Sequence, residues 1–465
     1  MKKRLVLLCD GTWNDDGGDG PLTNIVRLRD ILARSLGARS SLDKHVSGVT
    51  DQHGVEHIVF YDRGVGTGPW LDRIKGGVFG LGLGHNVRQA YRFLARWYSP
   101  GDEIYVFGFS RGAFTARSVV GYLGAVGLLR KEHCTPTRES QAWEYYRTPP
   151  NDRLSGLWSK LTPFVHEREG VRVTCLGVFD TVGALGIPSQ RFRRLNRSKY
   201  EFHDVTLGSV SDVNLHAIAV DEQRRPFEAA VWRKPQFKCY GTKIEQVWFP
   251  GVHSDVGGGY VDHFGSKEPT YALDDISLDW MMKRVNAYCP TGLWFDLDRH
   301  WKKVREDWSR SPRHESRSGI FRLWGSPASR SILNIPPQAP GVTPVSHDRL
   351  LDSIGEMIHI SVLERMVPHD PKLDLGRGTQ NRYAPANVLE VLPLIEKTYG
   401  KRAHLERYNA ASVVKSDAAL VVDWNGDPID PISNEAGRTR VSGLIDAIRS
   451  SHGGSDLAAP EIDRQ

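Results

Sequence analysis

The sequence predicts an α/β fold, an α/β-hydrolase-like, doubly wound and mostly parallel sheet with helical and loop insertions. Two observations predict it. Five runs that are apolar on both faces end in clusters of Gly, Asp or Ser, which is typical of strands in a parallel sheet covered by helices. Segments with helical spacing lie between these runs. In such a sheet, active-site groups gather beyond the carboxyl ends of the strands, where these clusters fall.

The expected strands and helices follow in chain order. The strand runs are RLVLLCDGTWN (4–14), HIVFYDRGVGTG (57–68), EIYVFGFSRG (103–112), VRVTCLGVFDTVG (171–183) and IEQVWFPGVHSDVGGGY (244–260). Helical spacing occurs in 23–36, with Thr23 or Asn24 as the cap, and in 84–99. A further helix is expected to begin near Arg111, directly after the third strand.

Two regions interrupt this alternation. Residues 131–168 are polar, with Trp and Tyr at helical spacing, and about 290–345 are rich in Trp, Arg, Ser and Pro. The expected organisation is a first half of the core with the nucleophile turn (1–130), a helical insertion (131–170), a second half of the core (171–290), a loop-rich cap (291–345), a C-terminal helical part (346–450) and a disordered tail (451–465).

Composition excludes several classes of protein. The net charge of +6 comes from 61 basic and 55 acidic residues among 465, so nucleic acid is not an expected partner. The five cysteines are scattered and form no CxxC pair, which argues against a disulfide framework or a structural zinc site. The N-terminal apolar run is too short for a signal peptide, and no run is long enough to span a membrane. We therefore expect synthesis in the cytoplasm.

The stretch Gly108-Phe109-Ser110-Arg111-Gly112 matches G-x-S-x-G between an expected strand and an expected helix. A strand that turns abruptly into a helix strains its central residue and needs small neighbours, and it leaves the hydroxyl exposed at the edge of the sheet. Ser110 is therefore the candidate nucleophile. The competing interpretation is a glycine-rich turn with a serine that merely faces solvent.

A serine needs a histidine base and a carboxylate that orients it, in the chain order Ser, acid, His for this fold. Asp180 and His253 both follow strand-like runs and satisfy that order. A second pair remains open, with Asp255 as the acid and His359 as the base. His359 falls in a segment with helical spacing and could equally be a core histidine.

The oxyanion of acyl transfer needs two backbone N–H donors. One is expected from Arg111, the residue after the nucleophile, and the other from Gly11 or Thr12 in the loop after the first strand. Asp10, in the same loop, is expected to brace it rather than to react.

The blocks LCDGTWN, GFSRGAFTAR, GVFDTVGALG, VWFPGVHSDVGGGY and IHISVLER occur in order between residue 5 and about 365. In these blocks the chain resembles the α/β-hydrolase family of type VI secretion phospholipase effectors. The resemblance implies a hydrolase without a cofactor that acts on phospholipid esters, with Ser110 as nucleophile, Asp180 as acid and His253 as base. A lipid ester is the expected substrate, and a secretion-system or immunity protein is a candidate partner, although the resemblance does not imply secretion for every member. Any membrane contact is expected to be peripheral, because no run is long enough to span a bilayer. Whether the chain is an injected toxin or a housekeeping esterase stays open.

Two other functions remain as alternatives. Asp10, Asp62, Asp180, His253 and Asp255 fall near expected strand ends and could ligate a divalent ion in a metal-dependent hydrolase. The chain could also be a binding module on a hydrolase scaffold. The Arg and Trp residues of 296–325 could contact a lipid surface or could be a solvated insertion. Acyl-chain preference, the sn-1 or sn-2 position of the ester and the oligomeric state are not predicted.

Overall fold

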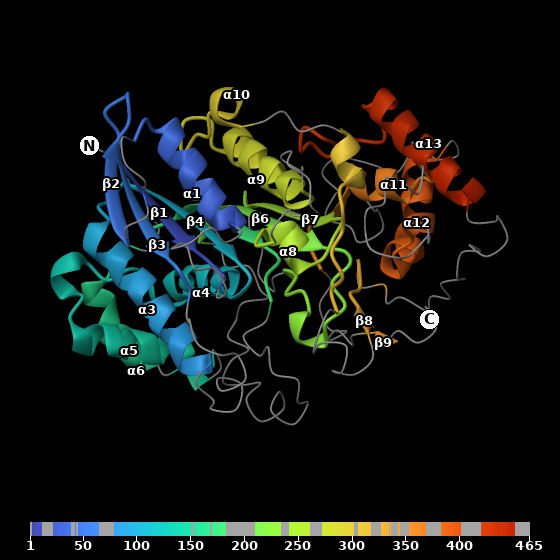
Figure 1. The fold of residues 1–465 in the computed structure, drawn as a ribbon. Coiled ribbons are helices and arrows are strands. Elements are labelled where there is room, and N and C mark those ends of the chain that lie inside the picture. Colours follow the sequence, from blue (N-terminus) through green and yellow to red (C-terminus); the bar gives the residue numbers. More distant parts are fainter. Residues whose placement is uncertain are drawn as a thin grey trace.

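A central sheet with helices on both faces forms the core of the computed structural model (Figure 1). The structure describes residues 2–11, 22–38, 42, 45–64, 79–149, 152–153, 155–167, 170–182, 210–233, 241–260, 272–301, 306–317, 327–333, 335, 343–344, 353–368, 383–400 and 420–451.

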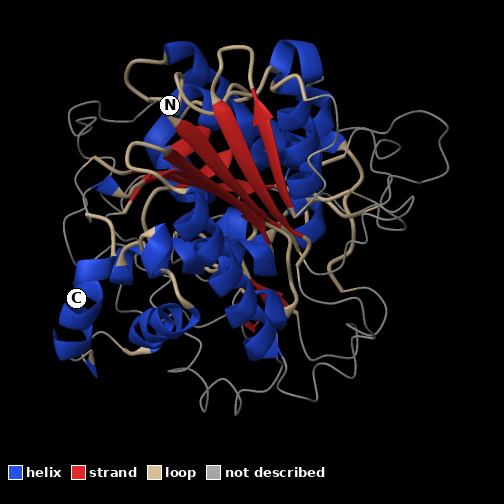
Figure 2. Cartoon of the chain, turned by 90° about the vertical axis from the view of Figure 1, so that its left-hand side faces the viewer, coloured by secondary structure: helices blue, strands red, loops and turns tan. Residues whose placement is uncertain are grey.

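Within these residues the main sheet has nine strands in the order β11-β10-β7-β6-β5-β4-β1-β3-β2. All neighbours are parallel except β2 and β3, which are antiparallel. This confirms the predicted fold class, and Figure 2 shows the twist of the strands. The strands are β1 (Lys3–Cys9), β2 (Val46–Thr50), β3 (Glu56–Asp62), β4 (Glu103–Phe109), β5 (Val173–Phe179), β6 (Ser211–Ala219), β7 (Lys243–Phe249), β10 (Glu356–His359) and β11 (Leu420–Val422); β8 (Ala328–Ser329) and β9 (Thr343–Pro344) form a separate pair.

Both faces of the sheet are buried, which explains the continuous apolar runs of its strands. In β1, Val6 and Leu8 lie in the cluster that includes α1 (Asn24–Ser35) and α9 (Asp274–Tyr288). Leu5 and Leu7 lie in the opposite cluster, with α3 (Phe79–Trp97) and α4 (Arg111–Val126). Thr23 caps α1, because its side chain accepts a hydrogen bond from Val26 N.

The remaining helices extend these layers (Figure 1). A third apolar cluster joins β10 and β11 to the C-terminal helices. Among the helices built from described residues, none combines the length and the apolar character needed to cross a bilayer. Besides α1, α3, α4 and α9, the described α-helices are α5 (Pro136–Arg147), α6 (Ser155–Leu161), α8 (His253–Gly257), α10 (Leu297–His300), α11 (Ile360–Met366), α12 (Ala386–Tyr399) and α13 (Glu435–Ser451).

The direction in which the sheet is wound changes between β1 and β4. From β1 the chain passes to β2 and β3 on one side of β1, and it then crosses to β4 on the other side and continues outward through β5, β6 and β7. Ligands of doubly wound sheets bind in the crevice outside the strand ends at such a point. The residues that follow β1 and β4 are Asp10 and Ser110.

The turn from β4 into α4 depends on two glycines. Ser110 has φ 57° and ψ −120°, a backbone conformation that residues other than glycine rarely adopt. A Cβ on Gly112 would lie 2.1 Å from Cys9 O, and one on Gly108 would lie 2.5 Å from Gly112 O. The first turn of α4 therefore packs with its backbone directly against the backbone at the end of β1. This close packing holds Ser110 in its strained conformation.

We expect Gly112→Ala to destabilise the protein by about 3 kcal/mol, because the new methyl group would overlap a strand carbonyl that cannot move away. The matched control is Gly443→Ala in α13, where a Cβ meets nothing within 4 Å. This control should stabilise by about 0.5 to 1 kcal/mol. Urea unfolding followed by circular dichroism measures both, and a Gly112→Ala protein as stable as the parent would contradict the packing described here.

Candidate functional site

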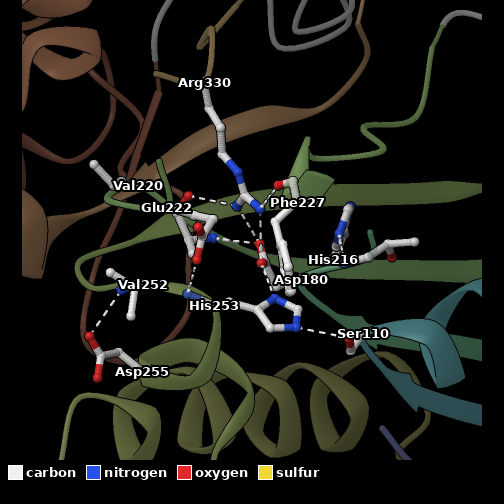
Figure 3. A network of polar contacts seen from close by, with 12 residues as sticks. Ser110, Asp180, His216, Val220, Glu222, Phe227, Val252, His253, Asp255 and Arg330 are labelled. Atoms are coloured by element: carbon white, nitrogen blue, oxygen red, sulfur yellow. Dashed lines mark hydrogen bonds and ion pairs between the residues drawn. The ribbon is translucent and has the colours of Figure 1, made fainter. Parts of the chain in front are cut away.

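Three side chains from the ends of three strands at one edge of the sheet form one hydrogen-bonded line (Figure 3). Ser110 follows β4, Asp180 follows β5, and His253 follows β7 as the first residue of α8. His253 Nε2 lies 2.8 Å from Ser110 Oγ, and His253 Nδ1 lies 2.6 Å from Asp180 Oδ2. Since a carboxylate only accepts, Nδ1 carries the proton and Nε2 is left to accept from the serine hydroxyl.

Asp180 is fully buried and surrounded by donors. Ala219 N donates to its Oδ1 over 2.9 Å, and Arg330 donates to both oxygens, over 2.6 and 3.0 Å. Burial by itself would raise the pKa of Asp180, but the cation of Arg330 and the bond from His253 outweigh it and hold this pKa well below its ordinary value. The carboxylate is therefore ionised at neutral pH.

The imidazole of His253 lies in an apolar environment. Its ring centroid is 4.8 Å from that of Phe109 and 4.9 Å from that of Phe227, and its backbone N–H donates to Glu222 over 3.2 Å. Burial lowers the pKa of His253, although the bond to Asp180 acts in the opposite direction. The ring is thus neutral at neutral pH, as a base must be.

The structure differs from the expectation of an exposed serine. Ser110 is only 7% exposed. His253 lies over its hydroxyl, and the loop after β1 packs against it, since a Cβ on Gly11 would lie 3.6 Å from Ser110 Cβ. The sequence pattern indicates the turn but not these covering segments.

The loop after β1 is braced by Asp10. Asp10 accepts hydrogen bonds from Thr23 Oγ1 (2.9 Å), Tyr61 OH (3.0 Å) and Gly11 N (2.6 Å). The Gly11 N–H, one of the expected oxyanion donors, is thus engaged by a carboxylate in this structure. Thr12, the alternative donor, lies outside the described residues. Arg111 is the first residue of α4, at the positive end of that helix dipole.

The structure does not bring the second candidate pair to Ser110. Asp255 accepts from Val252 N and pairs with His314, whose Nδ1 lies 2.6 Å from Asp255 Oδ1. His359 ends β10 and caps α11 through Ser361 N, and its ring stacks on Phe249. The expected helical position of His359 was wrong, because the residue stands at the strand-to-helix junction.

The candidate metal ligands have protein partners of their own. Asp10 is engaged in the loop after β1, Asp62 accepts from Gly64 N, and Asp180 is shared between Arg330 and His253. In the part of the chain that the structure describes, no group of three or more His, Cys, Asp or Glu is arranged to hold a metal ion.

Part of the Arg- and Trp-rich stretch 296–325 is packed. Trp308 is 1% exposed, and Trp301 donates to Asp279 over 2.9 Å and lies against the guanidinium of Arg27. Trp324 lies outside the described residues. Trp308 therefore lies in the interior, whereas Trp301 is half-buried and packs against α9 and α1.

Sequence analysis did not identify Glu222 and Arg330 as site residues. Glu222 follows β6, a strand that was not predicted because Asn214 and His216 interrupt its apolar pattern. The apolar residues before Asp221 and Glu222 could have indicated it, since they have the form of the other strand ends. Arg330 lies after the short strand β8, and nothing in its local sequence points to the site.

Comparisons with known proteins agree with these motifs. The family model described as "T6SS, Phospholipase effector Tle1-like, catalytic domain" matches residues 3–284. The uncharacterized protein YEL023C of Saccharomyces cerevisiae is 28% identical over 231 residues, a match that spans 49% of this chain and 32% of that relative.

Two solved structures are also similar to the chain. An uncharacterized protein from Pseudomonas aeruginosa is 14% identical with a TM-score of 0.36, over 99% of this chain and 68% of that one. The Tle1 effector bound to the VgrG spike of the type 6 secretion system is 21% identical with a TM-score of 0.29, over 57% and 52% of the two chains. TM-scores this low add nothing to the fold assignment.

Burial of Asp10 predicts a pH dependence of stability. Burial raises the pKa of Asp10 from 3.8 to about 6, although the bonds from Thr23, Gly11 and Tyr61 lower it. The folded state therefore holds this proton more tightly than the unfolded state, and the stability it contributes, about 3 kcal/mol, is lost as the pH rises from about 4 to about 6.

We expect Asp10→Asn to remove this pH dependence, so that the variant loses less stability than the parent between pH 4 and pH 6.5. Asp298→Asn, which changes an exposed carboxylate of α10, should follow the parent. Urea unfolding at several pH values measures the difference, and parallel curves for Asp10→Asn and the parent would refute the prediction.

Proposed function

Because this chain belongs to the Tle1-like catalytic-domain family of type VI secretion (T6SS) phospholipase effectors, we propose that it is a serine hydrolase. It cleaves carboxylic ester bonds of phospholipids or related lipids through an acyl-enzyme. The observation that carries the proposal is the line from Ser110 Oγ through His253 to Asp180, with separations of 2.8 and 2.6 Å.

In the proposed first step, Ser110 Oγ attacks the ester carbonyl while His253 Nε2 takes the hydroxyl proton. Asp180 accepts from Nδ1–H, keeps the imidazole in the required tautomer and stabilises the imidazolium that forms. His253 then gives the proton to the leaving alcohol. Water then enters, and its oxygen attacks the acyl carbonyl while His253 Nε2 takes one of its protons. The bond between the acyl carbon and Ser110 Oγ breaks, His253 returns the proton to Oγ, and the fatty acid leaves.

The oxyanion of each tetrahedral intermediate needs donors near Ser110 Oγ. We assign one to the backbone N–H of Arg111, at the positive end of α4. Gly11 and Thr12 remain the candidates for the second donor. In the case of Gly11, the oxyanion would share the N–H with Asp10, which accepts it in the structure described above.

The setting of the reaction is part of the proposal. The family description names a type VI secretion effector, which supports delivery by such a system and a lipid membrane as the source of substrate. If the protein is an antibacterial effector, an immunity protein that protects the producing cell would be a further partner. Trp294, 51% exposed, is a described aromatic side chain available for lipid contact.

We expect Ser110→Ala to abolish release of fatty acid from phospholipid vesicles and labelling by a fluorophosphonate, while the far-ultraviolet circular dichroism stays unchanged. The matched control is Ser118→Ala, which removes a buried hydroxyl about 12 Å further along the same helix and should keep full activity.

Mapping the labelled residue separates the alternatives. Hydrolysis that persists in Ser110→Ala, stops with a chelator and resists the fluorophosphonate would replace this proposal by a metal-dependent mechanism. Binding of lipid without hydrolysis by the parent protein would favour a non-catalytic module.

A further inference from the structure

Arg330 reaches the site from the cap region, 150 positions beyond Asp180 in the sequence. Its side chain is 3% exposed, and its guanidinium donates to both carboxylate oxygens of Asp180. The same group donates to Ala219 O over 2.9 Å and to Phe227 O over 2.5 Å. Figure 3 shows it on the side of Asp180 away from Ser110.

This arrangement has a chemical consequence for Asp180. Its Oδ2 accepts from both His253 Nδ1 and Arg330 Nη2, whereas its Oδ1 accepts from Arg330 Nη1 and Ala219 N. The planar guanidinium binds two oxygens at once, so it fixes the rotation of the carboxylate. The oxygen that faces the imidazole is thereby determined by a residue outside the line of three.

The cation also decides where the proton resides before the reaction. A buried carboxylate beside an imidazole with no other partner would hold a proton at neutral pH, either on the carboxylate or as an ion pair with imidazolium. A protonated pair cannot take the hydroxyl proton of Ser110. Arg330 supplies the compensating positive charge in place of that proton, so His253 can remain a free base.

Other charged and titratable groups surround the pair. Glu222 and Arg224 follow β6 and bond to each other over 2.8 Å. Arg224 lowers the pKa of His253, and Glu222 raises it. His216 of β6 is under the influence of both Asp180 and Arg117 of α4, and burial lowers the pKa of His216 to about 3, which keeps it neutral. Arg330 is the cation that bonds Asp180 in the part of the chain described here.

We propose that Arg330 is a positioning residue of the active site, whose guanidinium holds the Asp180 carboxylate ionised and turned toward His253. The inference rests on the proposed serine mechanism. The competing role is structural, since the two carbonyl bonds of Arg330 also fasten the β8 segment to the core.

The test compares Arg330→Gln, Arg330→Lys and the control Arg365→Gln. Arg365 of α11 is equally buried, 3% exposed, and donates to the carbonyls of Ser309 and Ser311 in the same cap region, without contact to the three site residues. For each variant, kcat and KM are measured on a soluble ester between pH 5 and 9.

We expect Arg330→Gln to move the acid limb of kcat/KM to higher pH by about one pH unit, because the pair regains a proton that must be lost. Arg330→Lys keeps the cation, so its acid limb stays in place, while kcat falls up to about 100-fold with little change in KM, since one ammonium does not fix both oxygens. Arg365→Gln should keep the parent's acid limb and kcat.

Two results would overturn the proposal: a folded Arg330→Gln protein with the parent's acid limb, or an Arg330→Lys protein with the parent's kcat. The second remains decisive if Arg330→Gln fails to fold.

A titration without turnover separates this proposal from the proposed function. In a Ser110→Ala background, the pKa of His253 is read by NMR of 15N-histidine-labelled protein, with the signal assigned from a His253→Gln variant. Adding Arg330→Gln should raise that pKa, and an unchanged midpoint would overturn the role of Arg330. If instead Ser110→Ala retains hydrolysis, the serine mechanism fails whatever the titration gives.

Discussion

The buried carboxylate of Asp180 is the group on which the rest of the site depends. An isolated buried anion costs several kcal/mol, and this penalty is offset only by full hydrogen bonding and a compensating charge. Both are present here, from Ala219 N, from His253 and from the two nitrogens of Arg330. One carboxylate therefore links strands of the sheet to the segment that follows β8.

The sheet places the other members around this anion. Because β4, β5, β6 and β7 are parallel neighbours, the residues that follow them all emerge on one edge. Ser110, Asp180, Glu222 and His253 come from these four ends in order. The close approach of α4 to β1, which only glycine permits at position 112, then fixes the direction in which the serine points.

How much could be predicted depends on the range of the interaction. Each of the five predicted strands formed, because a run buried on both faces is a local and continuous signal. Ser110 and Asp180 directly follow such runs and His253 follows one after a short turn, so the sheet brings the three near one another. The choice between Asp180 and Asp255 could not be made from position, since both lie at strand ends.

The residues that were missed act at long range or interrupt the local signal. The polar Asn214 and His216 concealed β6 and with it Glu222, although both are buried in the structure. Arg330 bonds the Asp180 carboxylate, which lies 150 positions away in the sequence, and no local periodicity can indicate such a pair. The burial of Ser110 likewise results from segments that meet it only in the folded chain.

The position of Arg330 determines how much of the chain the proposed catalytic site requires. The family match ends at residue 284, after Ser110, Asp180 and His253 but before Arg330. A fragment that ends at that boundary would contain Ser110, Asp180 and His253. Its buried Asp180 carboxylate would lack the cation of Arg330. The proposed site therefore requires a residue beyond the matched segment, and during synthesis it becomes electrostatically complete only after residue 330 has been translated.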